Sequence, residues 1–186
     1  MFYILVCLAL IGPLNAVNRF AGPFNLVARE PFECEDSGTN QICLNETSIR
    51  KTGKKSFRLS GRITLDIPIS DDLEVVLSFS VWGNGGWKPN FLTLQGKACT
   101  MFKEKLPGAF AVAMSSRNMT AECPIPPGSH LLEDADSKPV TNVEALPYNK
   151  YKVYIRFYDA TGILVGCFGF VIDVTPIVRR GYYDVS

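Results

Sequence analysis

Apolar and polar residues alternate from residue 56 to residue 69. The apolar positions are Phe57, Leu59, Gly61, Ile63, Leu65, Ile67 and Ile69. A period of two is typical of a β-strand with one buried face, and Gly61 suggests a bend in it. After a turn at Asp71 and Asp72, the pattern resumes with Leu73, Val75, Leu77, Phe79 and Val81. We expect the two segments to form an antiparallel pair.

A second alternating segment covers residues 150–157. Its apolar positions are Tyr151, Val153, Ile155 and Phe157. The sequence Asp-Ala-Thr-Gly at 159–162 then predicts a turn, and residues 163–174 form a run that is apolar on both faces. This pattern predicts a second hairpin, with its last strand in the middle of a sheet.

No segment after Gly22 shows a sustained helical period, and 12 prolines and 15 glycines interrupt the chain. The one helical candidate, residues 102–119, is broken by Pro107-Gly108 and offers at most a turn or two. We therefore predict an all-β protein, an immunoglobulin-like two-sheet β-sandwich.

The N-terminal segment is apolar and carries no charged side chain up to Ala16. It is typical of a secretory signal peptide over residues 1–16. A transmembrane anchor needs about 20 apolar residues, and Asn15, Asn18 and Arg19 come too early for one. The remaining residues, 17–186, suit a single domain, and we expect the protein to be secreted and extracellular.

Five cysteines follow the predicted signal peptide: Cys34, Cys43, Cys99, Cys123 and Cys167. In an oxidising compartment, two disulfides and one unpaired cysteine are the simplest arrangement. Two glycosylation sequons, at Asn45 and Asn118, fit the same compartment and predict surface turns.

The formal net charge of +1 gives no reason to expect a nucleic-acid partner. Basic residues cluster at Arg50, Lys51, Lys54, Lys55, Arg58 and Arg62, and acidic residues at Glu133, Asp134 and Asp136. Both clusters are interpreted as solvated faces or loops, and the alternative for the basic cluster is contact with an anionic membrane surface.

Residues for catalysis are scarce. The only histidine, His130, is expected in a loop beside the Pro-Pro-Gly-Ser turn, and the chain has no Gly-x-Ser-x-Gly motif. The cysteine spacing with a single histidine matches no zinc site. We expect a protein that is not an enzyme and that uses no metal or cofactor.

Several motifs in the second half of the chain occur in a recognisable order. They are Cys123-Pro124 with Gly128, Leu146-Pro147 with Tyr151, and Gly162 with Gly166-Cys167, preceded by Gly-Gly-Trp-Lys-Pro-Asn-Phe at 85–91. Over residues 55–175 the chain resembles the ML lipid-recognition superfamily. It is most similar to the ganglioside-activator branch and its arthropod relatives, the secreted B-type chemosensory proteins.

This resemblance implies disulfides between Cys99 and Cys123 and between Cys167 and Cys34, with Cys34 preferred to Cys43 as the second partner. It also implies an apolar cavity between two sheets that holds a lipid or another hydrophobic small molecule. The proline-rich turn after Cys123 would then clamp the rim of an open sandwich. The alternative is that this bridge only stabilises a small fold.

Ten apolar residues are candidates for the lining or the mouth of such a cavity. They are Phe79, Val81, Trp87, Phe91, Phe102, Phe110, Met114, Phe157, Phe168 and Phe170. Inward phenylalanines are also ordinary core residues of a sandwich. Trp87, placed by the sequence in an irregular glycine-rich stretch, is interpreted as a rim or membrane-touching residue.

The resemblance thus suggests a secreted carrier that presents its ligand to a receptor or an enzyme, or that acts in pheromone or chemosensory perception, with transient contact to a membrane surface. The rival prediction is a secreted β-sandwich with a filled core that binds another protein. The volume of the interior distinguishes the two.

Overall fold

The computed structural model describes residues 21–53, 57–107, 122–136, 142–143 and 145–177. The predicted signal peptide and the candidate residues Phe110, Met114 and Asn118 lie outside these ranges. The elements are β1 Ala21–Gly22, β2 Phe24–Glu33, β3 Ile42–Lys51, β4 Phe57–Leu65, β5 Glu74–Gly83, β6 Gly86–Lys97, α1 Ala98–Lys105, β7 Gly128–Asp136, β8 Leu146–Pro147, β9 Asn149–Tyr158 and β10 Leu164–Pro176.

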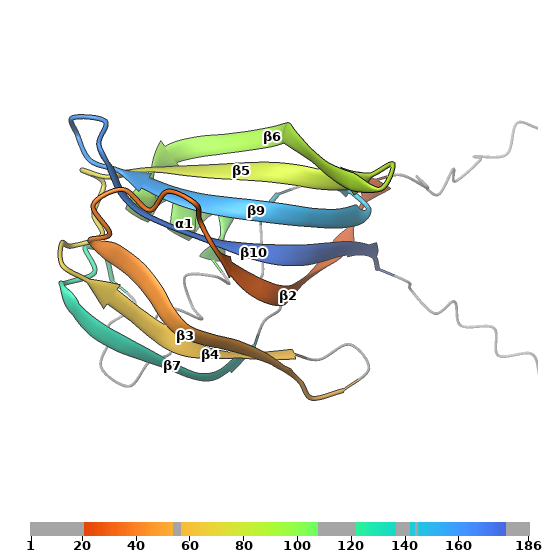
Figure 1. Cartoon of the computed structure of the whole chain (residues 1–186), viewed down its shortest axis with the longest axis horizontal. Helices are drawn as coiled ribbons and strands as arrows, with labels where there is room; N and C mark the ends of the chain where they lie inside the picture. Colours follow the sequence, from red (N-terminus) through yellow and green to blue (C-terminus); the bar gives the residue numbers. More distant parts are fainter. Residues whose placement is uncertain (1–20, 54–56, 108–121, 137–141, 144, 178–186) are drawn as a thin grey trace, which may run out of the picture.

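Two antiparallel sheets face each other (Figure 1). The larger sheet has the strand order β2-β10-β9-β5-β6, and the smaller has the order β3-β4-β7. A short pairing of β1 with β8 is separate from both. The predicted all-β two-sheet sandwich is therefore confirmed.

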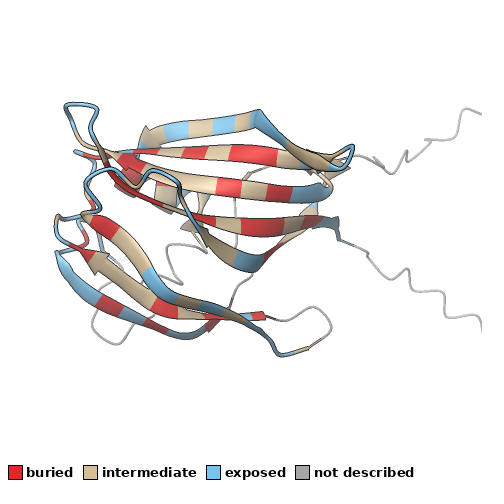
Figure 2. Ribbon diagram, in the orientation of Figure 1, coloured by how far each residue is buried: buried red, intermediate tan, exposed pale blue. Residues whose placement is uncertain are grey.

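The hairpin of β9 and β10 forms as predicted, and β10 lies between β2 and β9 inside the larger sheet. Both faces of β10 are enclosed, since on its outward side Val171 is buried and the Phe32 ring covers Gly169, and this fits the apolar residues on both faces of its sequence. In Figure 2, buried and partly buried positions alternate along β5 and β9, as expected for strands with one inward face.

The predicted pairing of the first two segments is wrong. Strand β4 pairs with β3 and β7, whereas β5 pairs with β6 and β9. The chain crosses from the smaller sheet to the larger one between Leu65 and Glu74, where Ile69 makes an isolated bridge with Ile125. At Gly61, where the sequence suggested a bend, the pairing register of β4 with β7 shifts between Leu59 and Gly61.

Helix α1 begins at Ala98, before the helical segment expected from the sequence. Ala98, Cys99 and Met101 form its buried face, and the helix ends before Pro107, which does not favour helical backbone in the residue preceding it. Lys103 and Lys105 lie in its last turn, where positive charge interacts favourably with the helix dipole.

The two sheets approach each other closely at Gly166 on β10. A side chain there would overlap the backbone oxygen and Cβ of Ile42 on β3, so only glycine allows this approach. Nearby, Phe157 of β9 and Val165 of β10 are fully enclosed and pack in the same cluster as Ile42. This end of the sandwich is closed by tight packing.

Both predicted disulfides are present. Cys34 pairs with Cys167, and Cys99 pairs with Cys123. The first joins the segment after β2 to the neighbouring strand β10. The second joins α1 to the segment that leads into β7 of the smaller sheet. Because α1 follows β6, an edge strand of the larger sheet, this disulfide links elements attached to the two sheets. Cys43 is the one unpaired cysteine among the described residues.

Candidate functional site

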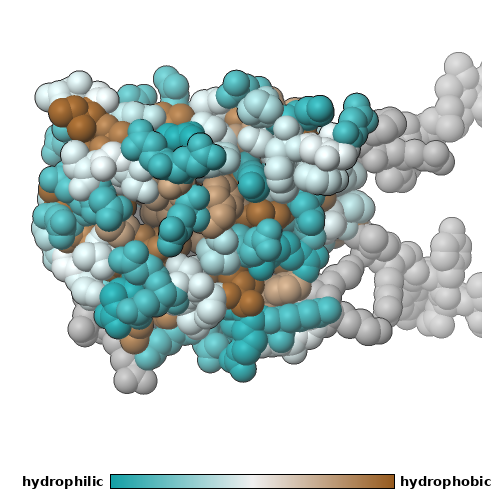
Figure 3. Space-filling view, in the orientation of Figure 1, coloured by the Kyte–Doolittle hydropathy of each residue, from teal (hydrophilic) through white to brown (hydrophobic). Residues whose placement is uncertain are grey.

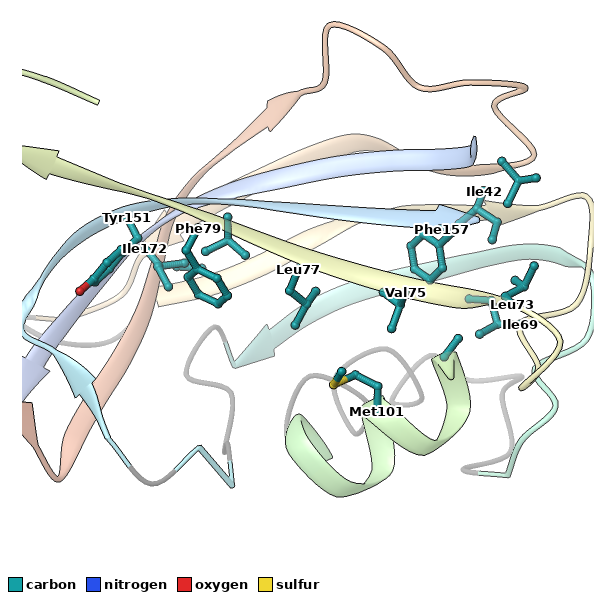
Figure 4. Packing of buried hydrophobic residues seen from close by; sticks show 14 of the residues in the cluster. Ile42, Ile69, Leu73, Val75, Leu77, Phe79, Met101, Tyr151, Phe157 and Ile172 are labelled. Carbon is teal, nitrogen blue, oxygen red and sulfur yellow. The ribbon is translucent and has the colours of Figure 1, made fainter. Parts of the chain in front are cut away.

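The inward face of the larger sheet is defined by strand register, because residues directly opposite each other point to the same side. Phe79 on β5, Val153 on β9 and Phe170 on β10 are opposite one another, as are Leu77, Ile155 and Phe168. Figure 4 shows Leu77 and Val75 directed toward Met101 of α1, with Tyr151 and Phe79 farther along the same face.

The inward face of the smaller sheet is also apolar. Its buried apolar residues are Ile42, Phe57, Leu59, Leu65, Leu132 and Ala135; Ile49 and Ile63 are partly exposed, and the buried His130 lies opposite Ile63. Apolar side chains from both sheets therefore face a common interior. On the face of the molecule shown in Figure 3, hydrophobic side chains reach the surface between the two layers, within a largely hydrophilic surround.

Burial within this interior is uneven. Phe157 and Val75 near the closed end, and Tyr151 and Val174 toward the other end, are at most 2% exposed. Between them, Ile155 faces inward from the middle of β9, the third of five strands, yet is only partly buried. Phe168 and Phe170 beside it on β10 are also partly exposed. In a close-packed sandwich the central inward residue would be fully enclosed.

The partly exposed residues that pack against the buried cluster come from eight elements. They are Phe24 and Leu26 of β2, Ile49 of β3, Ile63 of β4, Val81 of β5, Leu92 and Leu94 of β6, Phe102 of α1, Ile155 of β9, and Phe168 and Phe170 of β10, with further members in the loops. These side chains define the candidate site, which we call the inter-sheet site.

Four of the candidate phenylalanines form a continuous row. The ring centroids of Phe102 and Phe157 are 6.1 Å apart, those of Phe157 and Phe168 5.9 Å, and those of Phe168 and Phe170 6.2 Å. Such spacing is typical of packed aromatic pairs. The row joins α1, β9 and β10 along one wall of the inter-sheet site.

Phe79, Phe91 and Val81 lie near Tyr151. The Phe79 and Phe91 ring centroids are 6.2 and 5.6 Å from that of Tyr151, and Phe91 is 44% exposed. The Tyr151 hydroxyl donates a hydrogen bond to the Pro147 carbonyl oxygen, 2.7 Å away, and burial raises the pKa of this phenol. Phe91 therefore lies at the margin of the interior, and its role at a mouth stays a prediction.

Trp87 does not lie in an irregular stretch, as the sequence suggested, but in strand β6. It pairs with Trp82, and Val81 pairs with Lys88, so the two tryptophans point to the opposite side of the sheet from Phe79 and Val81. Trp87 therefore does not join the candidate residues that face the inter-sheet site. A register shift in the β5–β6 pairing, between Phe79 and Val81, accompanies this arrangement.

His130 is not in a loop, as the sequence suggested. It lies on β7 opposite Ile63 and is only 8% exposed. One ring nitrogen, Nε2, is 3.3 Å from the Pro126 carbonyl oxygen. Asn45 likewise lies on strand β3 rather than in a turn, and its side chain is exposed beside a register shift in the pairing with β4.

The ten candidate residues did not include several inward residues, notably Tyr151, Ile155, Ile63, Leu92 and Leu94. The sequence pattern did mark Tyr151, Ile155 and Ile63 as inward, because these residues alternate with polar residues in the same way as Phe157 and Leu65. The choice of candidates favoured phenylalanine and left out Tyr151 and most aliphatic residues.

Within the described ranges, no three His, Cys, Asp or Glu side chains are grouped so that they could hold a metal ion. Among the same residues, no helix is long and apolar enough to cross a membrane.

The sequence matches no protein-family model and no curated protein. Among solved structures, the fold is similar to that of chicken MD-1, whose crystal structure contains lipid IVa. The TM-score is 0.35 at 14% sequence identity, and the match covers 82% of this chain and 97% of the MD-1 chain. No residue of the inter-sheet site is assigned from so distant a similarity.

Proposed function

We propose that this protein is a secreted, non-enzymatic carrier that holds a lipid or another hydrophobic small molecule in the inter-sheet site. The observation that carries the proposal is the partial exposure of Ile155, at the centre of the inward face of the larger sheet. Exposed apolar surface inside a sandwich is unfavourable unless an apolar molecule covers it.

The size of the expected gain supports a lipid-like ligand. Burying a chain of about 16 carbons contributes roughly 12 kcal/mol at about 0.8 kcal/mol per methylene. Association and ordering offset a large part of this gain, so reversible micromolar to nanomolar binding is expected. Such binding suits a carrier that must also release its ligand.

Secretion is supported by the two disulfides, which are typical of oxidising compartments. The resemblance to the ML superfamily extends the proposal to delivery of the ligand to a receptor or enzyme, including a role in chemosensory perception. The sequence order of Cys123-Pro124, Leu146-Pro147 and Gly166-Cys167 supports this extension.

Native mass spectrometry of the secreted protein tests the proposal directly. We expect a co-purified lipid, and after its removal we expect saturable uptake of a fluorescent fatty acid. A protein that carries no lipid and takes up none would contradict the proposal and favour the rival prediction, a sandwich with a filled core that binds another protein.

An Ile155→Trp variant tests the location of the site. If space lies beside Ile155, the larger side chain occupies it, and fatty-acid uptake falls with little loss of stability. If the interior is filled, the same change overpacks it at a cost of about 1 to 3 kcal/mol in the free energy of unfolding. The matched control is Leu131→Trp, because Leu131 is 42% exposed on the outward side of β7.

A further inference from the structure

The outward face of the larger sheet carries a row of basic and aromatic side chains on its central strand, β9. The outward positions of β9 alternate with the inward residues Tyr151, Val153, Ile155 and Phe157, and no acidic residue occupies any of them. They are Lys150, Lys152, Tyr154, Arg156 and Tyr158. We call this set the β9 row.

Aromatic rings surround Lys152 in the β9 row. Its ammonium nitrogen is 5.2 Å from the ring centroid of Phe32 on β2 and 5.3 Å from that of Trp87 on β6. Trp87 packs edge-on against Trp82, with ring centroids 5.1 Å apart. Cation–π contact holds the ammonium in place but leaves its three N–H donors available to an acceptor.

Tyr154 and Arg156 continue the same arrangement. The Tyr154 ring packs edge-on against Phe32, with centroids 4.9 Å apart, and the Arg156 guanidinium carbon lies 4.8 Å from the Tyr154 centroid. One guanidinium nitrogen of Arg156 donates to the Ser78 hydroxyl oxygen at 3.2 Å. Rings and cations from β2, β5, β6 and β9 thus form one continuous surface.

The basic side chains of the β9 row are not neutralised by ion pairs among the described residues. The ion pairs that this part of the chain contains join Arg29 to Asp173, Arg50 to Asp134 and Arg62 to Glu46. Asp173 is opposite Lys150 in register but is engaged by Arg29. The other carboxylates near this face, Glu30 and Glu74, lie at its margins on β2 and at the start of β5.

The β9 row is partly open to solvent, since Lys150 is exposed and the other four side chains of the row are half-buried. Ser80 is opposite Lys152, and Ser78 and Gly169 are opposite Tyr154. From Lys150 to Arg156 the row extends about 20 Å, at about 3.3 Å per strand residue. Its positive charges therefore follow a line, with aromatic rings between them.

We propose that the β9 row binds a linear acidic polysaccharide that carries carboxylate or sulfate groups. The cations would pair with the acidic groups, and the C–H faces of the sugar rings would pack on Tyr154 and the neighbouring rings. The line of charge matches an extended polyanion, and charge complementarity sets its orientation along β9.

Two other partners fit this surface less well. An extended acidic peptide would find no backbone partner on it, because β9 is already paired with both β10 and β5. An anionic membrane presents a plane of negative charge. Docking of this face on the membrane would bring the carboxylates of Glu30, Asp173 and Glu74 against that plane, together with only a single line of cations.

Binding is measured with heparin oligosaccharides as the sulfated probe and hyaluronan oligosaccharides as the carboxylated one. Both tryptophans of the chain, Trp82 and Trp87, lie at this surface, so their fluorescence reports on it. We expect saturable binding of at least one acidic probe, weakened by salt, and none of uncharged dextran. Equal binding of dextran, or no binding of either acidic probe, would overturn the proposal.

The decisive variant is Lys152→Gln with Arg156→Gln. We expect the affinity to fall about tenfold or more at low salt, and the slope of log affinity against log salt to fall by about two, since two charges are lost. Tyr154→Leu is expected to weaken binding with the slope unchanged. The control, Lys103→Gln with Lys105→Gln, removes the same charge from α1 and is expected to bind normally.

Three further outcomes would also overturn the proposal. They are equal losses in the control variant, tighter binding of poly-glutamate than of either polysaccharide, and tighter binding to phosphatidylserine vesicles. Fatty-acid uptake is measured on the same variants and is expected to be unchanged, because the β9 row and the inter-sheet site lie on opposite faces of the larger sheet. Failure of this inference is therefore distinguishable from failure of the proposed carrier function.

Discussion

At the residue scale, the absence of a side chain at Gly169 determines where the ring of a neighbouring residue, Phe32, can lie. Gly169 lies on the outward side of β10, opposite Phe32 and Tyr154. The Phe32 ring covers Gly169 so closely that a Cβ there would overlap it. The position of Phe32, and through it the ring contacts of Lys152, therefore depends on glycine at residue 169.

We expect Gly169→Ala to displace the Phe32 ring and to lower the free energy of unfolding by about 1 to 3 kcal/mol, since overpacking forces side chains out of place. Urea unfolding measures this loss. The control is Gly83→Ala, because no atom lies within 4 Å of a Cβ built there. Equal stability of the two variants would show that Phe32 does not depend on Gly169.

At the element scale, helix α1 receives its N-terminal cap from a distant residue. The N-cap residue, Lys97, makes no capping hydrogen bond through its side chain. Instead, the Asp71 carboxylate accepts hydrogen bonds from the Thr100 backbone N–H at 2.9 Å and from the Thr100 hydroxyl at 2.8 Å. These bonds lower the pKa of Asp71. The turn before β5 thus holds the start of α1.

We expect Asp71→Ala to lower the free energy of unfolding by about 1 kcal/mol at neutral pH, as for loss of a helix cap. The pKa of Asp71 is lower in the folded protein than in the unfolded chain, so the charged carboxylate stabilises the fold at pH values above its ordinary pKa of about 3.9. This stabilisation is lost as the pH falls through the lowered pKa of the folded protein. The difference between variant and parent should therefore disappear in acid.

Denaturant unfolding at several pH values measures this difference. Asp72→Ala is the matched control, since Asp72 lies in the same turn and accepts its side-chain hydrogen bond from Ser70 rather than from α1. A difference between Asp71→Ala and the parent that persists unchanged in acid would contradict a role for the charged carboxylate.

At the scale of the whole molecule, the two disulfides close loops of very different length. The sequence separation is 24 residues for Cys99–Cys123 and 133 residues for Cys34–Cys167. If a bridge acts mainly by restricting the unfolded chain, removing them should cost about 3.5 and about 5 kcal/mol respectively. The longer loop should therefore give the larger loss.

Guanidinium unfolding of the two paired cysteine-to-serine variants, Cys99/Cys123 and Cys34/Cys167, measures these losses. Secretion is the second measurement, and we expect both variants to be secreted poorly. A larger loss for the Cys99–Cys123 variant would instead indicate that this bridge acts in the folded state, by joining α1 to the segment before β7 and so clamping the two sheets together.

The sequence by itself determined four strands, β4, β5, β9 and β10, and most of their inward residues. Alternation with period two is a local property, so it placed Phe79, Phe157, Leu59 and Leu65 correctly on inward faces. Continuous apolar character likewise indicated that β10 lies inside a sheet.

Only the tertiary structure decided which strands are partners and on which side of the larger sheet Trp87 lies. The alternation of β4 and β5 is the same whether they pair together or lie in different sheets, because pairing depends on long-range packing rather than on local pattern. Trp87 shows the same limit, because its place on the outward side follows from the pairing of β6 with β5, which brings it opposite Trp82. Only contacts across the sheet determine which residues of two strands become partners, and these contacts are not visible in the local pattern of the sequence.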